Sequence, residues 1–240
     1  MKKLPLKKIP IKLSQILRLP FFNSILRTTP VNPEWGFSRG VPIDRFYIEN
    51  FLSKNSQMIR GNILSVGDDY YAQRYSHGAL KRSDVLHISD SRNATIVADL
   101  ADAPQIASNT FDCFLLIQTL QFIYDVQSAI ETTHRILKPG GTVLATFSGI
   151  SPLKDDEWND SWYWNFTAIS ALKMFQEYFE TNEIEVGSHG NVKAATAFLH
   201  GLSVKDCGVR DLSLLDSSFP VIITVKATKR SQSDSPNVSD

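Results

Sequence analysis

The sequence predicts an α/β protein with a doubly wound, mostly parallel sheet that carries helices on both faces. Three observations support this fold class. Short apolar runs typical of buried strands recur through the middle of the chain. Helix-like or crossover segments separate them, and parallel strands need such connections. The chain has 240 residues, 42% hydrophobic and 21% charged, which is enough for one substantial core.

The elements are expected in a regular order along the chain. Apolar residues at helical spacing predict a helix over residues 43–52, and the break at 138–141 ends a second helix face that begins near residue 126. Two late strands, 184–186 and 219–225, are expected on either side of a helix over 191–202. The buried-strand patterns before them are 62–67, 84–88, 94–99, 111–117 and 142–147.

The two ends of the chain differ in composition from the middle. Residues 1–33 are predicted to be a basic extension, because no acidic residue precedes Glu34. Prolines interrupt it, which leaves at most a short amphipathic helix around residues 11–19. A mobile tail, a transit peptide and a weak peripheral contact of residues 2–27 with a membrane stay open. Residues 230–240, rich in Ser, Asp, Pro and Asn, are predicted to be disordered.

Charge and apolar run lengths exclude several classes of protein. Lys plus Arg equals Asp plus Glu, at 25 each, so no nucleic-acid partner is expected. No apolar run approaches the roughly 18 residues of a spanning helix, and no clean signal peptide is visible, so the cytoplasm is the default location. Cys113 lies in a predicted strand, and with Cys207 it forms no disulfide framework. No residue spacing suggests a metal site.

Two stretches around the predicted fourth and fifth strands carry a family resemblance. Residues 109–112 read NTFD, and residues 134–144 read HRILKPGGTVL. They resemble the class I S-adenosylmethionine-dependent methyltransferases, in which FD opens the fourth strand and LKPGG leads into the fifth. The resemblance covers residues 63–147 and, more loosely, WNFT at 164–167. It implies a methyltransferase-like domain over residues 34–229, with seven strands of which the last is antiparallel.

The LKPGG segment itself is assigned to the scaffold. Pro139 stops a helix, and the glycines that follow allow backbone angles that other residues avoid. The chain can then return to the sheet at once. These properties explain the segment without any role in chemistry.

The predicted cofactor loop departs from the pattern of the resembled family. The ligand crevice of such a sheet lies beyond the carboxyl ends of its strands. The family places there a strand that ends in an acidic residue and three spaced glycines. Residues 65–70, SVGDDY, keep only the first glycine, and Ser65 replaces the acidic residue. Gly67 and Asp68 are predicted cofactor residues, and an altered cofactor site is the alternative, because bulkier residues limit the approach of the backbone.

Four further cofactor residues follow from the ends of the later strands. His87 ends the second strand, where the resemblance places a partner of the ribose hydroxyls; a locally satisfied histidine is the alternative. Asp99 ends the third strand, where the resemblance implies a carboxylate for the adenine amino group, with Leu100 against the ring. Gln118, with Thr119 and Gln121, follows the fourth strand near the expected methyl group. Capping of the next helix, near Asp125, would equally explain these polar groups.

Two segments are expected to border the methyl acceptor. The resemblance makes the region before the first helix a lid, in which Arg39 or Arg45 would hold a carboxylate or phosphate, or else pair with Asp44 or Glu49. Aromatic residues after the fifth strand would form a wall suited to sugars, rings or a sulfonium cation, or would serve packing alone. The lid residues are Trp35, Gly36, Arg39, Asp44 and Arg45, and the aromatic residues are Trp158, Trp162, Tyr163, Trp164 and Phe166.

The resemblance implies S-adenosylmethionine as the cofactor and methyl transfer to an oxygen or nitrogen of a small molecule or glycan precursor. Such a reaction rests chiefly on in-line positioning, and it needs a general base only for a hydroxyl acceptor. No catalytic residue is assigned; Asp125, His87 and His189 are weak candidates for a base. The alternative is a methyltransferase-fold protein that binds a ligand or partner without turnover. A nicotinamide-dependent enzyme is disfavoured, because the loop lacks spaced glycines.

Overall fold

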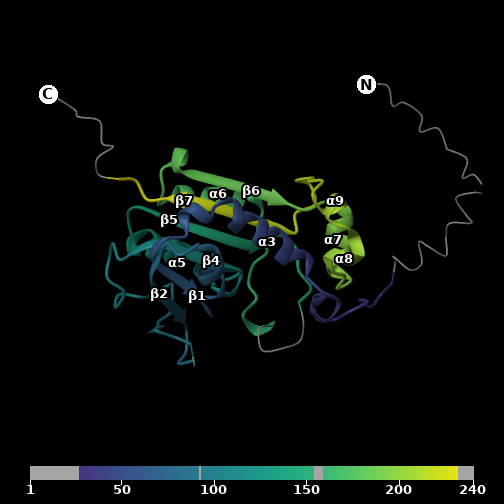
Figure 1. Cartoon of the computed structure of the whole chain (residues 1–240), viewed down its shortest axis with the longest axis horizontal. Helices are drawn as coiled ribbons and strands as arrows, with labels where there is room; N and C mark the ends of the chain where they lie inside the picture. Colours follow the sequence, from purple (N-terminus) through teal and green to yellow (C-terminus); the bar gives the residue numbers. More distant parts are fainter. Residues whose placement is uncertain (1–26, 92, 154–158, 232–240) are drawn as a thin grey trace, which may run out of the picture.

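A computed structural model describes residues 27–91, 93–153 and 159–231. A seven-stranded sheet crosses it in the order β3-β2-β1-β4-β5-β7-β6 (Figure 1). β1 to β5 pair in parallel, and β7 is antiparallel to both β5 and β6. The predicted fold class, including the antiparallel last strand, is therefore confirmed. The strands are β1 (Gly61–Val66), β2 (Leu80–His87), β3 (Ile96–Val97), β4 (Phe111–Ile117), β5 (Leu137–Ser148), β6 (Ile184–His189) and β7 (Ile222–Thr228).

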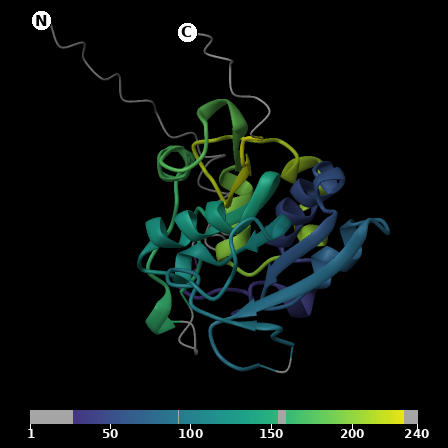
Figure 2. The same cartoon turned by 90° about the vertical axis from the view of Figure 1, so that its left-hand side faces the viewer.

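Helices cover both faces of the sheet, as Figure 2 shows for α3 on one side and α5 on the other. The core has two parts, because successive strand residues point to opposite faces. Cys113 and Leu115 of β4 pack with α3 and α7, whereas Phe114 and Leu116 pack with α5 and α6. The α-helices are α3 (Ile43–Lys54), α4 (Tyr70–Tyr75), α5 (Val126–Ile136), α6 (Ala168–Gln176), α7 (Val192–Leu199), α8 (Val204–Cys207) and α9 (Val209–Leu212). The short 3-10 helices are η1 (Phe37–Arg39), η2 (Ser56–Met58), η3 (Leu120–Phe122), η4 (Asn159–Ser161) and η5 (Thr181–Glu183).

Several strand boundaries differ from the predicted ones. Only Ile96–Val97 of the predicted strand 94–99 pairs with β2, because the chain turns at Asp99, whose carbonyl accepts the amide of Asp102 at 3.0 Å. β7 begins at Ile222 and not at residue 219, since Pro220 has no amide for the ladder. β2 begins at Leu80, four residues before the predicted start at Asp84.

The passage from α5 into β5 explains the LKPGG segment. β5 already begins at Leu137, five residues before the predicted start. Phe111 of β4 pairs with Leu137, but Cys113 pairs with Thr142, so residues 138–141 bulge out of the ladder. Gly140 has a positive φ of 80°, and a Cβ on Gly141 would come within 2.8 Å of the Lys138 carbonyl oxygen. A scaffold role for the segment agrees with this geometry.

The segment before α3 is attached to the C-terminal part of the domain. The amides of Val31 and Asn32 donate to the His200 carbonyl at 2.9 and 3.1 Å. Arg39 binds Asp206 in bidentate fashion, at 2.8 and 3.1 Å. The predicted helix around residues 11–19 and the predicted disorder of residues 232–240 lie outside the described residues. Within the described ones, no helix is long and apolar enough to cross a membrane.

Candidate active site

A cavity of about 560 Å³ lies at the carboxyl ends of β1, β2 and β4. β1 and β4 are the neighbouring strands at which the strand order reverses, the usual ligand position in such sheets. Its volume is in the range of small-molecule sites. The structure brings all six sequence-predicted cofactor residues into its lining; their individual contacts with a cofactor stay predictions. They are Gly67, Asp68, His87, Asp99, Leu100 and Gln118.

The loop after β1 contains one glycine whose conformation matters. Gly67 has a φ of 81°, and no described atom lies within 4 Å of the position that a Cβ would take there. Glycine adopts this backbone conformation without strain, and it leaves that space to a ligand. Asp68 Oδ1 accepts the amide of Tyr70 at 3.0 Å, at the start of α4. One oxygen of the Asp68 carboxylate is thus used to begin a helix.

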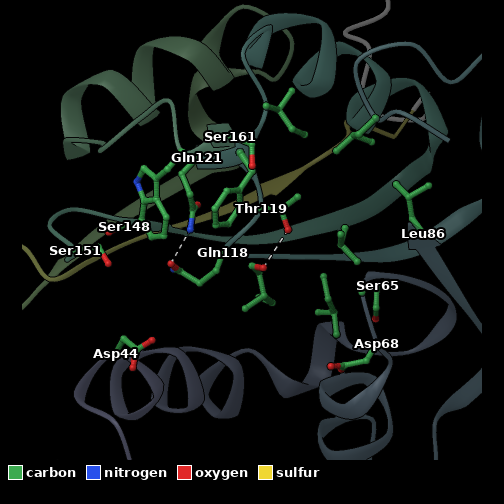
Figure 3. A pocket seen from close by; sticks show the side chains of 18 of the residues that line it. Asp44, Ser65, Asp68, Leu86, Gln118, Thr119, Gln121, Ser148, Ser151 and Ser161 are labelled. Atoms are coloured by element: carbon green, nitrogen blue, oxygen red, sulfur yellow. Dashed lines mark hydrogen bonds between the residues drawn. The ribbon is translucent and has the colours of Figure 1, made fainter. Parts of the chain in front are cut away.

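Ser65 occupies the position where the resembled family has an acidic residue. Its side chain is 3% exposed and lines the cavity, and its Oγ has no hydrogen-bond partner among the described residues. Figure 3 places Ser65 on the same side of the cavity as Asp68. An unsatisfied buried hydroxyl costs about 1–3 kcal/mol. A ligand that hydrogen-bonds with this hydroxyl would remove that cost.

The ends of β2 and β3 contribute a histidine, a carboxylate and an apolar wall. The Ser89 amide donates to His87 Nδ1 at 3.2 Å. This local partner agrees with the alternative that His87 is a locally satisfied histidine. Asp99 is exposed, and its Oδ1 accepts the amide of Ala101 at 2.9 Å. Because a carboxylate offers about four acceptor positions, Asp99 can also accept a ligand amino group. Leu100 beside it is buried.

The end of β4 is held in a strained conformation. Gln118 has a φ of 49°, which is uncommon for a residue other than glycine. Its backbone amide donates to the Thr146 carbonyl at 2.9 Å, and its side-chain Nε2 to Thr146 Oγ1 at 3.2 Å. Its Oε1 accepts from Gln121 Nε2 at 3.0 Å (Figure 3). The alternative of helix capping is wrong for these glutamines, because Asp125 caps α5 through the Ser128 amide.

The wall formed by α3 carries an unusual carboxylate. Asp44 lines the cavity, its Oδ1 is buried without a hydrogen bond to any described residue, and its nearest cation is Arg45 Nε at 3.9 Å. Burial raises the pKa of the Asp44 carboxyl, and Arg45 and the amides of the first helical turn oppose this shift. Arg45 also donates to the Tyr71 hydroxyl at 3.2 Å. The lid therefore contributes a carboxylate of which one oxygen, Oδ1, has no partner among the described residues.

The expectation that Arg39 binds an anionic group of the acceptor is not supported. Arg39 does not line the cavity, and its Nε and Nη2 both donate to the Asp206 carboxylate. Glu49, an expected partner of these arginines, pairs instead with Arg74 at 3.2 Å. Arg45 is the lid arginine that reaches the cavity.

The predicted aromatic wall is only partly at the site. Trp162 lines the cavity and packs edge-to-face on Phe122, with ring centroids 4.9 Å apart. Tyr163 and Trp164 are exposed outside the cavity lining, and Phe166 is part of the core. Trp158 lies outside the described residues. Residues missed by sequence reasoning complete the lining; they include Phe37, Phe122, Ser148, Ser151 and Ser161.

Two of the weak candidates for a base lie away from the cavity. Asp125 is the N-cap of α5, where it accepts from the Ser128 amide at 3.1 Å, and this bond lowers the pKa of its carboxyl. His189 of β6 contacts Thr224 Oγ1 at 3.0 Å. Neither residue is in the cavity lining. Both are therefore withdrawn as bases for chemistry at this site.

Comparison with known proteins agrees with the fold. Residues 60–145 match a family model described as a methyltransferase domain. Curated protein sequences give no match. Among solved structures, the 4+2 cyclase SpnF is similar with a TM-score of 0.53 and 16% identity, covering 90% of this chain and 94% of its own. An S-adenosylmethionine-dependent methyltransferase from Mesorhizobium loti has a TM-score of 0.51 and 14% identity. The match covers 78% of this chain and 98% of that chain.

A third solved structure contains a bound product of the cofactor. It is phosphoethanolamine N-methyltransferase 2 from Haemonchus contortus, in complex with S-adenosylhomocysteine. Its TM-score is 0.50 and its identity 15%, and the match covers 77% of this chain and 53% of that chain. At such identities these likenesses show the fold.

The cavity also fits the cofactor that this family uses. The unpaired Ser65 hydroxyl, the open space at Gly67 and the Asp99 carboxylate beside buried Leu100 offer polar and apolar contacts within one cavity. The family match supports S-adenosylmethionine as that cofactor. Strand order, cavity position and the match over residues 60–145 together support a methyltransferase domain of the class I S-adenosylmethionine-dependent type.

Proposed function

We propose that the protein transfers the methyl group of S-adenosylmethionine to an oxygen or nitrogen of a small molecule or glycan precursor, in the cytoplasm. The observation that carries this proposal is the single cavity that joins Gly67, Asp99 and Gln118 to a second region around Asp44 and Trp162. The first region suits a cofactor and the second an acceptor. One cavity of about 560 Å³ can hold parts of both, side by side.

The residues of the first region have distinct parts in binding. Gly67 lets the backbone come close to the ligand, and Asp68 and Ser65 offer polar groups beside it. Asp99 accepts from the adenine amino group, with Leu100 against the ring and His87 near the ribose. These assignments follow the positions of the residues at the strand ends.

Catalysis would depend on positioning more than on acid–base chemistry. Bound S-adenosylmethionine supplies a methyl group that is already electrophilic. Gln118 is fixed by Thr146 and by Gln121 at the end of β4, so its side chain is preorganised in the middle of the cavity. Rigid groups that hold an acceptor in line with the methyl group can lower the barrier by several kcal/mol, roughly 7–11 at best.

A protein of this fold that binds without methyl transfer is the second candidate. Its support is the end of β1 and the loop that follows. Ser65 of β1 replaces an acidic residue, and Asp68 and Asp69 of the loop stand where small residues would let a ligand approach. The similar fold of a 4+2 cyclase agrees with the general rule that fold alone does not define a reaction.

The two candidates differ in one measurable outcome. Full-length protein is incubated with S-adenosylmethionine that carries a deuterated methyl group, together with a small-molecule extract, and the products are identified by mass spectrometry. Methyl transfer predicts mass-shifted acceptors and the release of S-adenosylhomocysteine. The control is Gly67→Val, which fills the cofactor loop. Wild-type protein that binds S-adenosylhomocysteine but yields no mass-shifted product would favour the non-catalytic candidate.

A further inference from the structure

The charged groups around the cavity are predominantly acidic. Three carboxylates, from Asp44, Asp68 and Asp99, line it against one guanidinium, from Arg45. That guanidinium is already engaged by the Tyr71 hydroxyl and by Asp44. A site with this balance repels anionic ligands and attracts cationic ones.

Of these three acidic residues, Asp44 is the one that is partly buried, whereas Asp68 and Asp99 are exposed. Figure 3 shows the Asp44 side chain extending from α3 toward the side of the cavity that carries Gln118. Its Oδ1 has no hydrogen bond to a described residue, and Arg45 Nε, at 3.9 Å from Oδ2, is too distant for one. Asp44 also interacts electrostatically with the Tyr71 hydroxyl, whose pKa it helps to raise. A buried carboxylate oxygen without a partner is destabilising, and a ligand that donates to Oδ1 would compensate.

A second unpaired acceptor lies across the cavity. Gln121 is 1% exposed, and its Oε1 has no partner among the described residues. The rings of Trp35, Phe37 and Trp162 also contribute to the lining of this cavity. Aromatic faces bind apolar bodies and also attract cations. Acceptors and rings together define a pocket for a molecule that has donors on an apolar frame.

We propose that Asp44 binds the amino group of the methyl acceptor, and that this acceptor is an amine on an apolar, ring-containing body. An ammonium group provides three donors and a positive charge for the Asp44 carboxylate, and its nitrogen can attack the methyl group once one of these protons has passed to that carboxylate or to solvent. An acidic head group at this position would meet the like charge of Asp44. The role of this amine as a methyl acceptor rests on the proposed methyl transfer. The binding of an amine at Asp44 does not depend on turnover.

The test compares three probes that share one ring and differ in the head group. Phenethylamine, phenethyl alcohol and hydrocinnamate are titrated into full-length protein at neutral pH, with and without S-adenosylhomocysteine. We expect phenethylamine to bind most tightly. Asp44→Asn should weaken its binding about tenfold or more, because a charge-assisted bond is lost. Glu49→Gln removes a carboxylate from the same helix outside this cavity and should leave the affinity unchanged.

Two results would overturn the inference. One is unchanged phenethylamine affinity in a folded Asp44→Asn variant. The other is a preference of the wild-type protein for hydrocinnamate, which needs no variant and points to Arg45 as the anchor. A third outcome separates the two proposals. If amine binding depends on Asp44 but the protein does not bind S-adenosylhomocysteine, the amine site is supported and the proposed methyl transfer is refuted.

Discussion

Replacing Asp99 with alanine tests the predicted adenine contact. Asp99 is exposed in the turn that follows β3, and its Oδ1 accepts the amide of Ala101 at 2.9 Å. Alanine removes that bond and the charge-assisted bond expected with the ligand. The ligand bond is worth about 1.5–3 kcal/mol, which corresponds to a 10- to 150-fold loss of affinity. The turn bond is exposed, so its loss should lower stability by roughly 1 kcal/mol or less.

Isothermal titration with S-adenosylhomocysteine and thermal unfolding separate these two effects. Asp99→Asn keeps an acceptor for Ala101 but has no charge, so it should restore thermal stability and still bind the ligand more weakly than the wild type. Asp102→Ala is the matched control, because Asp102 is an exposed neighbour outside the cavity lining. Wild-type affinity in a folded Asp99→Ala variant would show that the assignment of Asp99 to the adenine is wrong.

Other perturbations give further checks. Gly67→Ala introduces a side chain at a φ of 81°, so it should cost roughly 1 kcal/mol of stability and weaken S-adenosylhomocysteine binding in titrations. Burial raises the pKa of Asp44, so ionisation of this carboxyl costs more in the folded than in the unfolded state; Asp44→Asn should therefore raise the unfolding temperature at neutral pH, and the gain should disappear below the ordinary value of 3.8. Lys229→Met removes donors to Asn109 Oδ1 and to the Leu137 carbonyl, both at 2.9 Å, which should lower stability by about 1–3 kcal/mol in denaturant unfolding without changing ligand affinity. Deletion of residues 2–27 should leave the domain folded and abolish salt-sensitive flotation with anionic vesicles, at about 1 kcal/mol per close charge; full-length protein that never floats would refute the membrane contact.

The elements that were predicted well are those whose burial is visible in their own short stretch of sequence. Residues 111–117 form β4 as expected, because an almost continuous apolar run is typical of a central parallel strand. The edge strand β3 is much shorter than its sequence pattern, since the turn at Asp99 ends its pairing. α6 was missed, because the N3 position of its capping box at Thr167 is Ser170 and not the more familiar glutamate or glutamine.

The candidate site was predictable where chain position alone decides it. Gly67, Asp99 and Gln118 follow strands, so the topology brings them together at one edge. The state of Asp44 was not predictable, because a carboxylate in the first turn of a helix usually faces solvent. Its environment depends on walls contributed by distant segments, and the same is true of the positions of Phe37 and Ser161 in the cavity lining.

The central claim is that this cavity binds S-adenosylmethionine. The most direct measurement is isothermal titration of folded full-length protein with S-adenosylmethionine and with S-adenosylhomocysteine, each to saturation. We expect both to bind at one site per chain, with reduced affinity in Asp99→Ala and unchanged affinity in Asp102→Ala. Protein that unfolds cooperatively but gives no binding heat with either ligand, at several temperatures, would contradict the account.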